Sequence, residues 1–220
     1  MANNADEPDY ASPPCFMHEL DAGFRHVPPA PDADVMRWRK VERERLIAVR
    51  LAIGADERLA FANVIASRLD ELIGDAEGKV VSLYWPFRGE PDLRGWMKAL
   101  TAGGVKCALP VVVAKGAPLV FRHWDSNSRL ERGVWNIPFP ADGEEVLPDI
   151  VVAPVVGFDA GCWRLGYGGG FYDRTLAAMG RKPIVLGVGY SIQRIETIHP
   201  QPHDIAMEAV VTETGITSPR

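Results

Sequence analysis

The stretch KVVSLYWPFRGEPDLRGWMKALTAGGVKCALPVVV, residues 79–113, predicts a strand, a helix and a second strand in succession. The two apolar runs KVVSLYW and VKCALPVVV are typical of buried strands. The segment between them, EPDLRGWMKALTAGG, is predicted as a helix that Gly103 and Gly104 close. Because a helix between two buried strands is the repeating unit of a parallel sheet, this stretch favours an α/β fold.

Helices are also predicted on both sides of this stretch. Residues 35–53 mix apolar residues with charges in a pattern that favours a helix, and a second helix is expected from Asp56, as its N-cap, to about Ile73. Gly54 separates the two. Downstream, residues 171–180, FYDRTLAAMG, predict a further helix that ends at its glycine.

The remaining strands follow from further apolar runs. Residues 130–149, LERGVWNIPFPADGEEVLPD, are rich in turn residues and predict a long loop over the surface. Strands are predicted over 118–124, 149–159, 183–190 and 208–213.

The beginning of the chain differs in composition from the rest. Residues 1–34 carry six prolines and seven acids against the single basic Arg25, which predicts an extended arm. Residues 35–220 are expected to form one α/β domain, since 220 residues, 47% of them hydrophobic, suit a single core. The pair Cys15 and His18 in the arm lacks further ligands and does not favour a metal site.

Charge and cysteine content exclude several classes of protein. The net charge of -5 gives no basic field for nucleic acid or an anionic membrane surface. Three scattered cysteines argue against a disulfide framework and for a reducing compartment. The polar start and the short apolar runs predict neither a targeting segment nor a membrane span, so we expect a soluble, cytoplasmic protein.

The stretch RLGYGGGFYDR, residues 164–174, places four glycines where a strand gives way to a helix. Their amides can form a concave nest for phosphate at the helix end, although a plain glycine turn also accounts for them. Neither a Walker motif nor a complete dinucleotide fingerprint is present. Asp173 favours the phosphate interpretation, because a carboxylate beside phosphates suits a magnesium ion between them.

This stretch resembles the signature of the 5-formyltetrahydrofolate cyclo-ligase family, also called methenyltetrahydrofolate synthetase. YWPFRGEPD, NIPFP and HDIAMEAVVTE are similar to other family motifs in the same order, so the resemblance covers about four fifths of the chain. It implies a three-layer α/β/α fold with a mainly parallel sheet, similar to sugar-phosphate isomerases and CoA-transferases. It also implies a ligase of one-carbon metabolism that uses ATP and Mg²⁺ to close 5-formyltetrahydrofolate to 5,10-methenyltetrahydrofolate, with release of ADP and phosphate.

The resemblance assigns roles to single residues. Arg39 and Arg43 match a Lys and an Arg that bind ATP phosphates, although Arg39 replaces Lys and Glu42 stands where Leu is usual. Glu208 likewise stands where Asp is common. The implied ATP-binding residues are Arg39, Arg43, Gly166, Tyr167, Gly168, Gly169, Gly170, Phe171 and Arg174. The implied folate-binding residues are Tyr84, Phe87, Glu90 and Tyr172. The implied catalytic residues are Arg164, Tyr172 and Asp173, and the implied metal ligands are Asp173 and Asp204.

Simpler explanations exist for several of these residues. Arg39, Arg43 and Arg50 form one stripe on a helix, which also suits a solvated basic face. Glu90 also suits a solvated loop acid or a helix cap. The expectation for Asp92 is that it caps the next helix. His203 is expected to be a surface histidine, and no partner pattern supports Cys162 as a nucleophile.

Two other functions remain open on the sequence. One is a paralogue that uses the same ATP cradle on another small acid, which the departures at Arg39 and Glu42 motivate. The other is a folate-binding module without turnover. The expected partners are small molecules, without nucleic acid or membrane, and the chain is expected to be a monomer or dimer.

Overall fold

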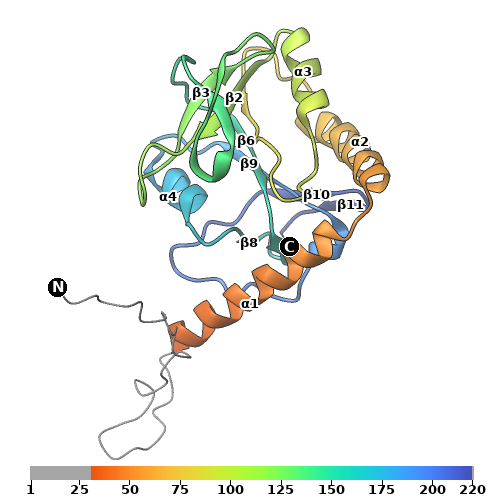
Figure 1. Ribbon diagram of the computed structural model, residues 1–220, viewed down its shortest axis with the longest axis vertical. Coiled ribbons are helices and arrows are strands. Elements are labelled where there is room, and N and C mark those ends of the chain that lie inside the picture. Colours follow the sequence, from red (N-terminus) through yellow and green to blue (C-terminus); the bar gives the residue numbers. More distant parts are fainter. Residues whose placement is uncertain (1–30, 220) are drawn as a thin grey trace, which may run out of the picture. The chain divides into compact units, whose positions relative to one another are not determined.

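The computed structural model describes residues 31–219 (Figure 1). The chain divides into two units between Trp38 and Arg39, and the described part of the first is the beginning of helix α1 (Pro31–Leu51). Most of the predicted arm therefore lies outside the described residues, as does the pair Cys15 and His18. Its last residues, 31–34, are helical, so α1 begins earlier than the expected start at residue 35.

The second unit is built on a seven-stranded sheet whose five central strands are parallel. The two edge strands, β3 and β11, pair antiparallel to their neighbours. This mainly parallel sheet confirms the predicted fold class. In sheet order the strands are β11 (Gly215–Thr217), β10 (Ala209–Thr212), β9 (Ile184–Val188), β6 (Ile150–Pro154), β1 (Val80–Ser82), β2 (Lys106–Val111) and β3 (Val120–Trp124).

Helices cover both faces of the sheet, which explains the uninterrupted apolar runs of the strands (Figure 1). Along β6, Ile150 and Val152 pack into a core with α2 (Ala55–Ile73) and α3 (Arg94–Ala102). Val151 and Ala153 point to the opposite core, which includes Leu176 of α4 (Phe171–Ala178). The result is the expected order of three layers, helices, sheet and helix.

A third cluster of buried residues holds α1 against the segment that carries the glycine stretch. Leu46 and Ile47 of α1 pack with Val156, Leu165 and Ile198. Leu165 belongs to β8 (Arg164–Leu165), which pairs antiparallel with β7 (Gly157–Phe158). This short hairpin, which the sequence did not predict, therefore brings the glycine stretch beside α1.

The predicted surface loop contains regular structure, so that prediction was wrong in part. Strands β4 (Leu130–Arg132) and β5 (Pro138–Pro140) form an antiparallel hairpin around the short 3-10 turn η2 (Val134–Asn136). Trp135 and Asn136 at its tip have positive φ angles of 55° and 62°. Non-glycine residues rarely adopt this conformation, so sequence patterns did not reveal the hairpin.

The predicted helix caps also needed correction. Gly54 is the N-cap of α2, and Asp56 lies in the first turn, where its charge suits the helix dipole. Leu93 is the N-cap of α3, while the carboxylate of Asp92 accepts a hydrogen bond of 3.1 Å from the amide of Arg94. The helices end close to their predicted glycines, α3 at Gly103 and α4 two residues before Gly180.

No helix in residues 31–219 has both the length and the apolar character that crossing a membrane requires.

Candidate active site

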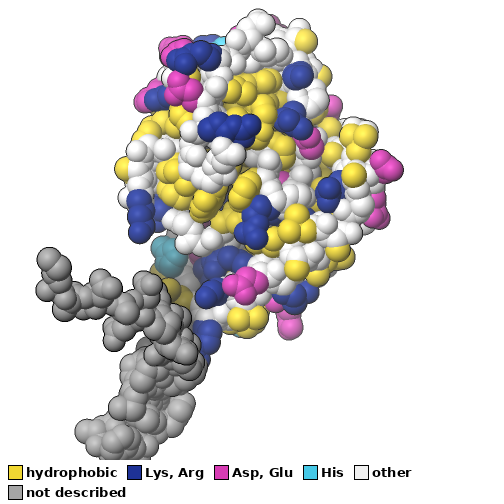
Figure 2. All heavy atoms as spheres, viewed as in Figure 1, with side chains coloured by type: hydrophobic (Ala, Val, Ile, Leu, Met, Phe, Trp, Pro, Cys, Tyr) yellow, Lys and Arg dark blue, Asp and Glu magenta, His cyan; other side chains and the backbone are white. Residues whose placement is uncertain are grey.

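A cavity of about 220 Å³ opens at the carboxyl ends of the parallel strands. Tyr84 follows β1, while Val111 ends β2 and Pro154 ends β6, and all three line the cavity. Carboxyl ends of parallel strands are where α/β folds commonly bind ligands. The molecular face in Figure 2 carries broad apolar areas bordered by Lys and Arg side chains.

Of the residues predicted for the site, all but Arg174 line this cavity. Arg174 lies beside it, where its guanidinium donates a hydrogen bond to the carbonyl of Gly169 and lies 5.4 Å from the ring centre of Phe171. The structure therefore brings segments far apart in sequence to one place, as the predictions required.

The glycine stretch needs its glycines for conformational reasons. Gly168 and Gly170 have φ angles of 91° and 61°, and Gly170 is the N-cap of α4. The guanidinium of Arg43 lies against this loop, and its Nε donates a hydrogen bond of 2.6 Å to the carbonyl of Gly166. A Cβ atom at Gly168 would come within 3.4 Å of Arg43 Cζ. Backbone and arginine thus pack closely at the start of α4.

Arg164 presents an unpaired donor beside Asp173. Its Nη2 donates a hydrogen bond of 2.8 Å to Asp173 Oδ1, and its side chain is only 3% exposed. Within residues 31–219, Nη1 of the same guanidinium has no hydrogen-bond partner. A buried cationic donor without an acceptor is costly, so this position suits an anionic oxygen of a ligand.

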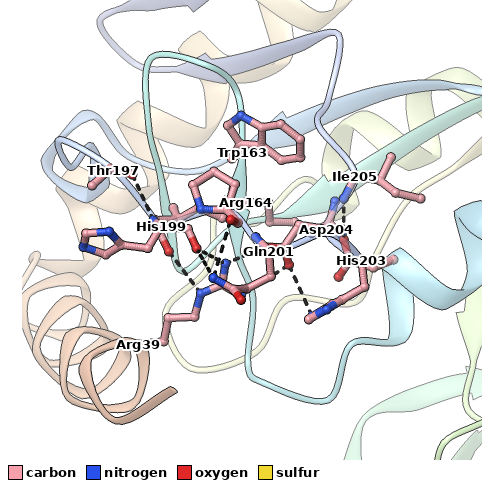
Figure 3. Close-up of polar contacts among 12 residues, drawn as sticks. Arg39, Trp163, Arg164, Thr197, His199, Gln201, His203, Asp204 and Ile205 are labelled. Carbon is pink, nitrogen blue, oxygen red and sulfur yellow. Dashed lines mark hydrogen bonds and ion pairs between the residues drawn. The ribbon is translucent and has the colours of Figure 1, made fainter. Parts of the chain in front are cut away.

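Arg39 and Asp204 form a buried ion pair (Figure 3). Arg39 Nη2 lies 2.5 Å from Asp204 Oδ2, and the guanidinium also donates to the carbonyls of Ile198 and His199 at 3.0 and 2.9 Å. Although burial works in the opposite direction, hydrogen bonds from Arg39 and from the Gln201 amide hold the pKa of Asp204 below its usual value. Arg39 as a phosphate ligand and Asp204 as a metal ligand stay predictions.

The carboxylates of Asp173 and Asp204 could hold a magnesium ion only if further oxygen ligands completed its coordination. No cluster of three or more metal-ligating side chains occurs among the described residues. Oδ1 of Asp173 accepts hydrogen bonds from Arg164 and from the amide of Ile205, and Asp173 lines the cavity. Mg²⁺ is commonly held by one or two carboxylates plus phosphate oxygens and water. Asp173 therefore fits such a site, whereas both oxygens of Asp204 already accept hydrogen bonds from Arg39.

Glu90 is a buried carboxyl group that also lines the cavity. Its Oε1 accepts a hydrogen bond of 2.9 Å from the Tyr167 hydroxyl, and its Oε2 accepts one of 2.9 Å from the amide of Phe87. Burial raises the pKa of Glu90 to about 7, although the nearby Arg50 works in the opposite direction. At 5% exposure Glu90 is not the solvated loop acid of the simpler explanation.

Three aromatic rings gather beside Glu90, and one of them was missed by the sequence analysis. Phe87 and Trp135 stack with ring centres 6.0 Å apart and an angle of 7° between their planes. Tyr167 is tilted against both, at 5.7 and 5.8 Å. Trp135 stands at the tip of the β4–β5 hairpin and is 51% exposed. The available signal was a large aromatic residue within a polar loop segment.

Other predictions have clear structural outcomes. Arg39 and Arg50 are buried, so a solvated basic face does not account for them. His203 is largely exposed, as expected for a surface histidine. Cys162 is buried, and its thiol donates to the carbonyl of Thr217. It does not line the cavity, in agreement with the absence of a nucleophile pattern.

The departure from the family pattern at Glu208 also has a structural explanation. Its Oε2 accepts a hydrogen bond of 2.6 Å from the backbone amide of Val185, the second residue of β9. The carboxylate therefore supports the sheet from the segment before β10, outside the residues that line the cavity.

The parallel sheet and the convergence of a glycine loop, arginines and buried carboxylates on one cavity define an α/β enzyme for small anionic substrates. A sequence model of the 5-formyltetrahydrofolate cyclo-ligase family matches residues 35–213. The chain belongs to this family.

Individual relatives agree with this assignment. The 5-formyltetrahydrofolate cyclo-ligase of Escherichia coli K12 is 30% identical over 174 residues, which cover 76% of this chain and 96% of the relative. That of Mycolicibacterium smegmatis is 31% identical over 153 residues, covering 65% and 78%. The solution structure of Aquifex aeolicus 5,10-methenyltetrahydrofolate synthetase aligns with a TM-score of 0.73 at 29% identity, over 83% of this chain and 93% of the other. The Mycoplasma pneumoniae synthetase, at 20% identity and a TM-score of 0.66, shares the fold over 80% and 98%.

Proposed function

We propose that this enzyme closes 5-formyltetrahydrofolate to 5,10-methenyltetrahydrofolate in a reaction that consumes ATP, requires Mg²⁺ and releases ADP and phosphate. One observation carries the proposal. The glycine stretch and Glu90 face a common cavity and are joined by the hydrogen bond between Tyr167 and Glu90. A phosphate cradle and an acceptor for a flat heterocycle therefore lie close enough for two substrates to react.

On the folate side, Glu90 supplies the directional contact. The reduced pterin ring of folate presents adjacent N–H donors, and a carboxylate can accept two of them side by side. The rings of Phe87, Trp135 and Tyr167 surround this position and offer flat apolar contact to the ligand. Tyr84 and Tyr172 complete the predicted set and line the same cavity.

On the phosphate side, the glycine amides, Arg43 and Nη1 of Arg164, which has no hydrogen-bond partner within residues 31–219, supply donors. Donors of this kind stabilise the charge that develops on a phosphoryl group during transfer. When bound through Asp173, Mg²⁺ would neutralise phosphate charge and help to align it. Arg164 pairs with Asp173 and stacks over Tyr172 at 5.3 Å, so these three residues lie together where the two substrates would meet.

In the proposed reaction, the formyl oxygen on N5 attacks the γ-phosphoryl group of ATP and displaces ADP. The N10 atom then adds to the activated formyl carbon, and phosphate leaves and takes up the N10 proton as the five-membered ring closes to the methenyl cation. These steps require alignment of the substrates and neutralisation of charge, without a covalent nucleophile from the protein. Water exclusion by the aromatic rings would favour ring closure over hydrolysis.

We also place the enzyme in the cytoplasm. Cys107 and Cys162, the two cysteines that the structure describes, are both free and buried, which agrees with a reducing compartment.

The test is to follow the near-ultraviolet absorbance of the methenyl product with 5-formyltetrahydrofolate, ATP and Mg²⁺. We expect product in the wild type and in Asp56→Asn, an exposed control, but a strong loss in Asp173→Asn. Calorimetry then separates the alternatives. Mg·ATP binding without product would point to another small acid as substrate. Formyltetrahydrofolate binding without Mg·ATP binding would contradict the proposal.

A further inference from the structure

Arg50, in the last turn of α1, is a fully buried cation in contact with the candidate active site. Its Nε donates a hydrogen bond of 3.0 Å to the carbonyl of Arg88, and its Nη1 donates one of 3.2 Å to the carbonyl of Val155. Its Nη2 donates the shortest bond, 2.6 Å, to the hydroxyl oxygen of Tyr167. All three nitrogens are therefore used, and each holds a different segment.

The contact with Tyr167 extends to Glu90. The Tyr167 hydroxyl accepts its hydrogen bond from Arg50 and donates its own proton to Glu90 Oε1. Because the arginine occupies the acceptor side of the oxygen, the hydroxyl proton is directed toward the carboxylate. The order Arg50, Tyr167, Glu90 is thus a chain of two hydrogen bonds with a fixed direction, and such chains strengthen each member.

Arg50 also shapes the turn that carries Glu90. Arg88 and Gly89 have φ angles of 49° and 79°, so the backbone makes a tight turn just before Glu90. A Cβ atom at Gly89 would lie 3.2 Å from Leu51 Cδ2 and 3.7 Å from Arg50 Cγ, which shows how closely α1 packs here. The bond from Arg50 to the Arg88 carbonyl fixes this turn from the helix side.

We propose that Arg50 is a positioning residue that, through the Tyr167 hydroxyl, orients the Glu90 carboxylate for the folate ring and supplies a positive charge near it. The inference rests on the proposed function of Glu90 as the folate acceptor. It assigns Arg50 to the reaction even though Arg50 is not among the residues that line the cavity. It also couples the folate side to the glycine stretch, since Tyr167 belongs to that stretch.

The other titratable groups around Glu90 are tyrosines, which supply no positive charge. Tyr167 and Tyr84 lie on neighbouring segments, with Tyr172 of α4 and Tyr190 after β9 farther around the carboxylate. Burial raises the pKa of each tyrosine, so all four stay neutral near pH 7. Among the described residues, Arg50 is the cation whose charge lowers the pKa of Glu90.

The experiment compares Arg50→Gln and Arg50→Lys with the wild type, using Arg68→Gln as a matched control. Arg68 also binds backbone carbonyls, of Thr212 and Glu213, but does not line the cavity. Steady-state kinetics are measured from pH 6 to pH 8.5. In parallel, glutamate labelled with ¹³C at the carboxyl reports the titration of Glu90 directly, and Glu90→Gln assigns its signal.

We expect Arg50→Gln to raise the KM for 5-formyltetrahydrofolate about fivefold at pH 7 and less at pH 8.5, because loss of the positive charge raises the pKa of Glu90. The kcat and the KM for ATP are expected to change less than about twofold, because a lost acceptor weakens folate binding above all. Arg50→Lys keeps the charge and should recover part of the loss. Arg68→Gln should leave all these values unchanged.

A purely structural role would give a different result. An unchanged Glu90 titration in Arg50→Gln, or a loss of activity that is equal at every pH, would overturn the inference. Should Arg50→Gln fail to fold, Tyr167→Phe removes the bridging hydroxyl, and an unchanged Glu90 titration in that variant would overturn it equally. If the wild type forms no methenyl product, the proposed function fails, while the ¹³C titration still decides the link between Arg50 and Glu90.

Discussion

The Tyr167 hydroxyl donates a hydrogen bond of 2.9 Å to Glu90, although 77 residues separate them in sequence. Tyr167 lies within the glycine stretch, and Glu90 closes the turn after β1. The contact therefore joins the proposed phosphate side of the cavity to the proposed folate side.

The glycine stretch should tolerate no side chain at Gly168. Its φ of 91° is strained for any other residue, at about 1–3 kcal/mol, and a Cβ atom there would lie 3.4 Å from Arg43 Cζ. We expect Gly168→Ala to raise the KM for ATP about tenfold or more, measured by methenyl product formation. Gly180→Ala, where a Cβ atom would meet nothing within 4 Å, is the matched control. Equal KM values in the two variants would contradict a phosphate role for the stretch.

The buried pair of Arg39 and Asp204 should dominate local stability. Removing one partner leaves the other charge buried without compensation, so Arg39→Ala is expected to lower the free energy of unfolding by about 3–5 kcal/mol. Denaturant unfolding of Arg39→Ala, Asp204→Ala and the double variant would measure this. The double variant should lose clearly less than the sum of the singles, because it leaves no unpaired charge.

The pair of Glu42 and Arg45 on the same helix, in which the Arg45 side chain is 53% exposed, is the control for that cycle. Surface ion pairs contribute little, so Arg45→Ala should change the free energy of unfolding by less than about 1 kcal/mol. Arg39→Ala and Asp204→Ala could instead each lower the free energy of unfolding as little as Arg45→Ala does, with losses that simply add in the double variant. That result would show that the buried pair does not form in solution.

Glu90 should make stability depend on pH in an unusual direction. Its pKa of about 7 in the folded protein lies above its ordinary value of 4.5, so the folded state binds more protons between these values. The free energy of unfolding should therefore fall as pH rises from 4.5 to 7, by at most about 3 kcal/mol from this group. Below pH 4.5 the contribution is fully present.

Glu90→Gln tests this dependence. The variant carries no ionisable group at this position, so it should be more stable than the wild type at pH 8 and similar to it at pH 4. Thermal or urea unfolding at several pH values measures the difference. If Glu90→Gln were less stable than the wild type at pH 8, burial of the ionised Glu90 carboxylate would not destabilise the fold, and the prediction would be wrong. The same variant should bind 5-formyltetrahydrofolate poorly, since the charged acceptor is gone.

Trp135 should contribute to affinity more than to stability. Its side chain is 51% exposed, so Trp135→Ala is expected to change the free energy of unfolding by less than about 1 kcal/mol. Loss of stacking on a flat ligand should raise the KM for 5-formyltetrahydrofolate about three- to tenfold. Trp135→Phe should recover part of this, and Leu147→Ala, an exposed apolar control outside the cavity, should have no effect. An unchanged KM in Trp135→Ala would remove this residue from the site.

Much of the architecture was predictable from local patterns. Apolar runs such as 149–159 predicted buried strands because strands covered on both faces need apolar residues at nearly every position. The spacing of strands and helices predicted the parallel sheet, and the glycines at 166–170 predicted a special backbone at the start of a helix. These features depend on hydrogen bonding and side-chain periodicity between near neighbours, which the order of residues alone determines.

The pairing of side chains was decided by the tertiary structure alone. The family resemblance assigned Arg39 to ATP and Asp204 to a metal, but nothing in the sequence identified the side chains that Arg39, Arg50 and Asp204 contact. Arg39 binds Asp204 across 165 residues, and Arg50 reaches Tyr167 across 117. Trp135 joins the cavity through a hairpin that depends on two rare backbone conformations. Such contacts depend on how separate elements pack in three dimensions, and no local spacing encodes which of many buried or charged groups will meet.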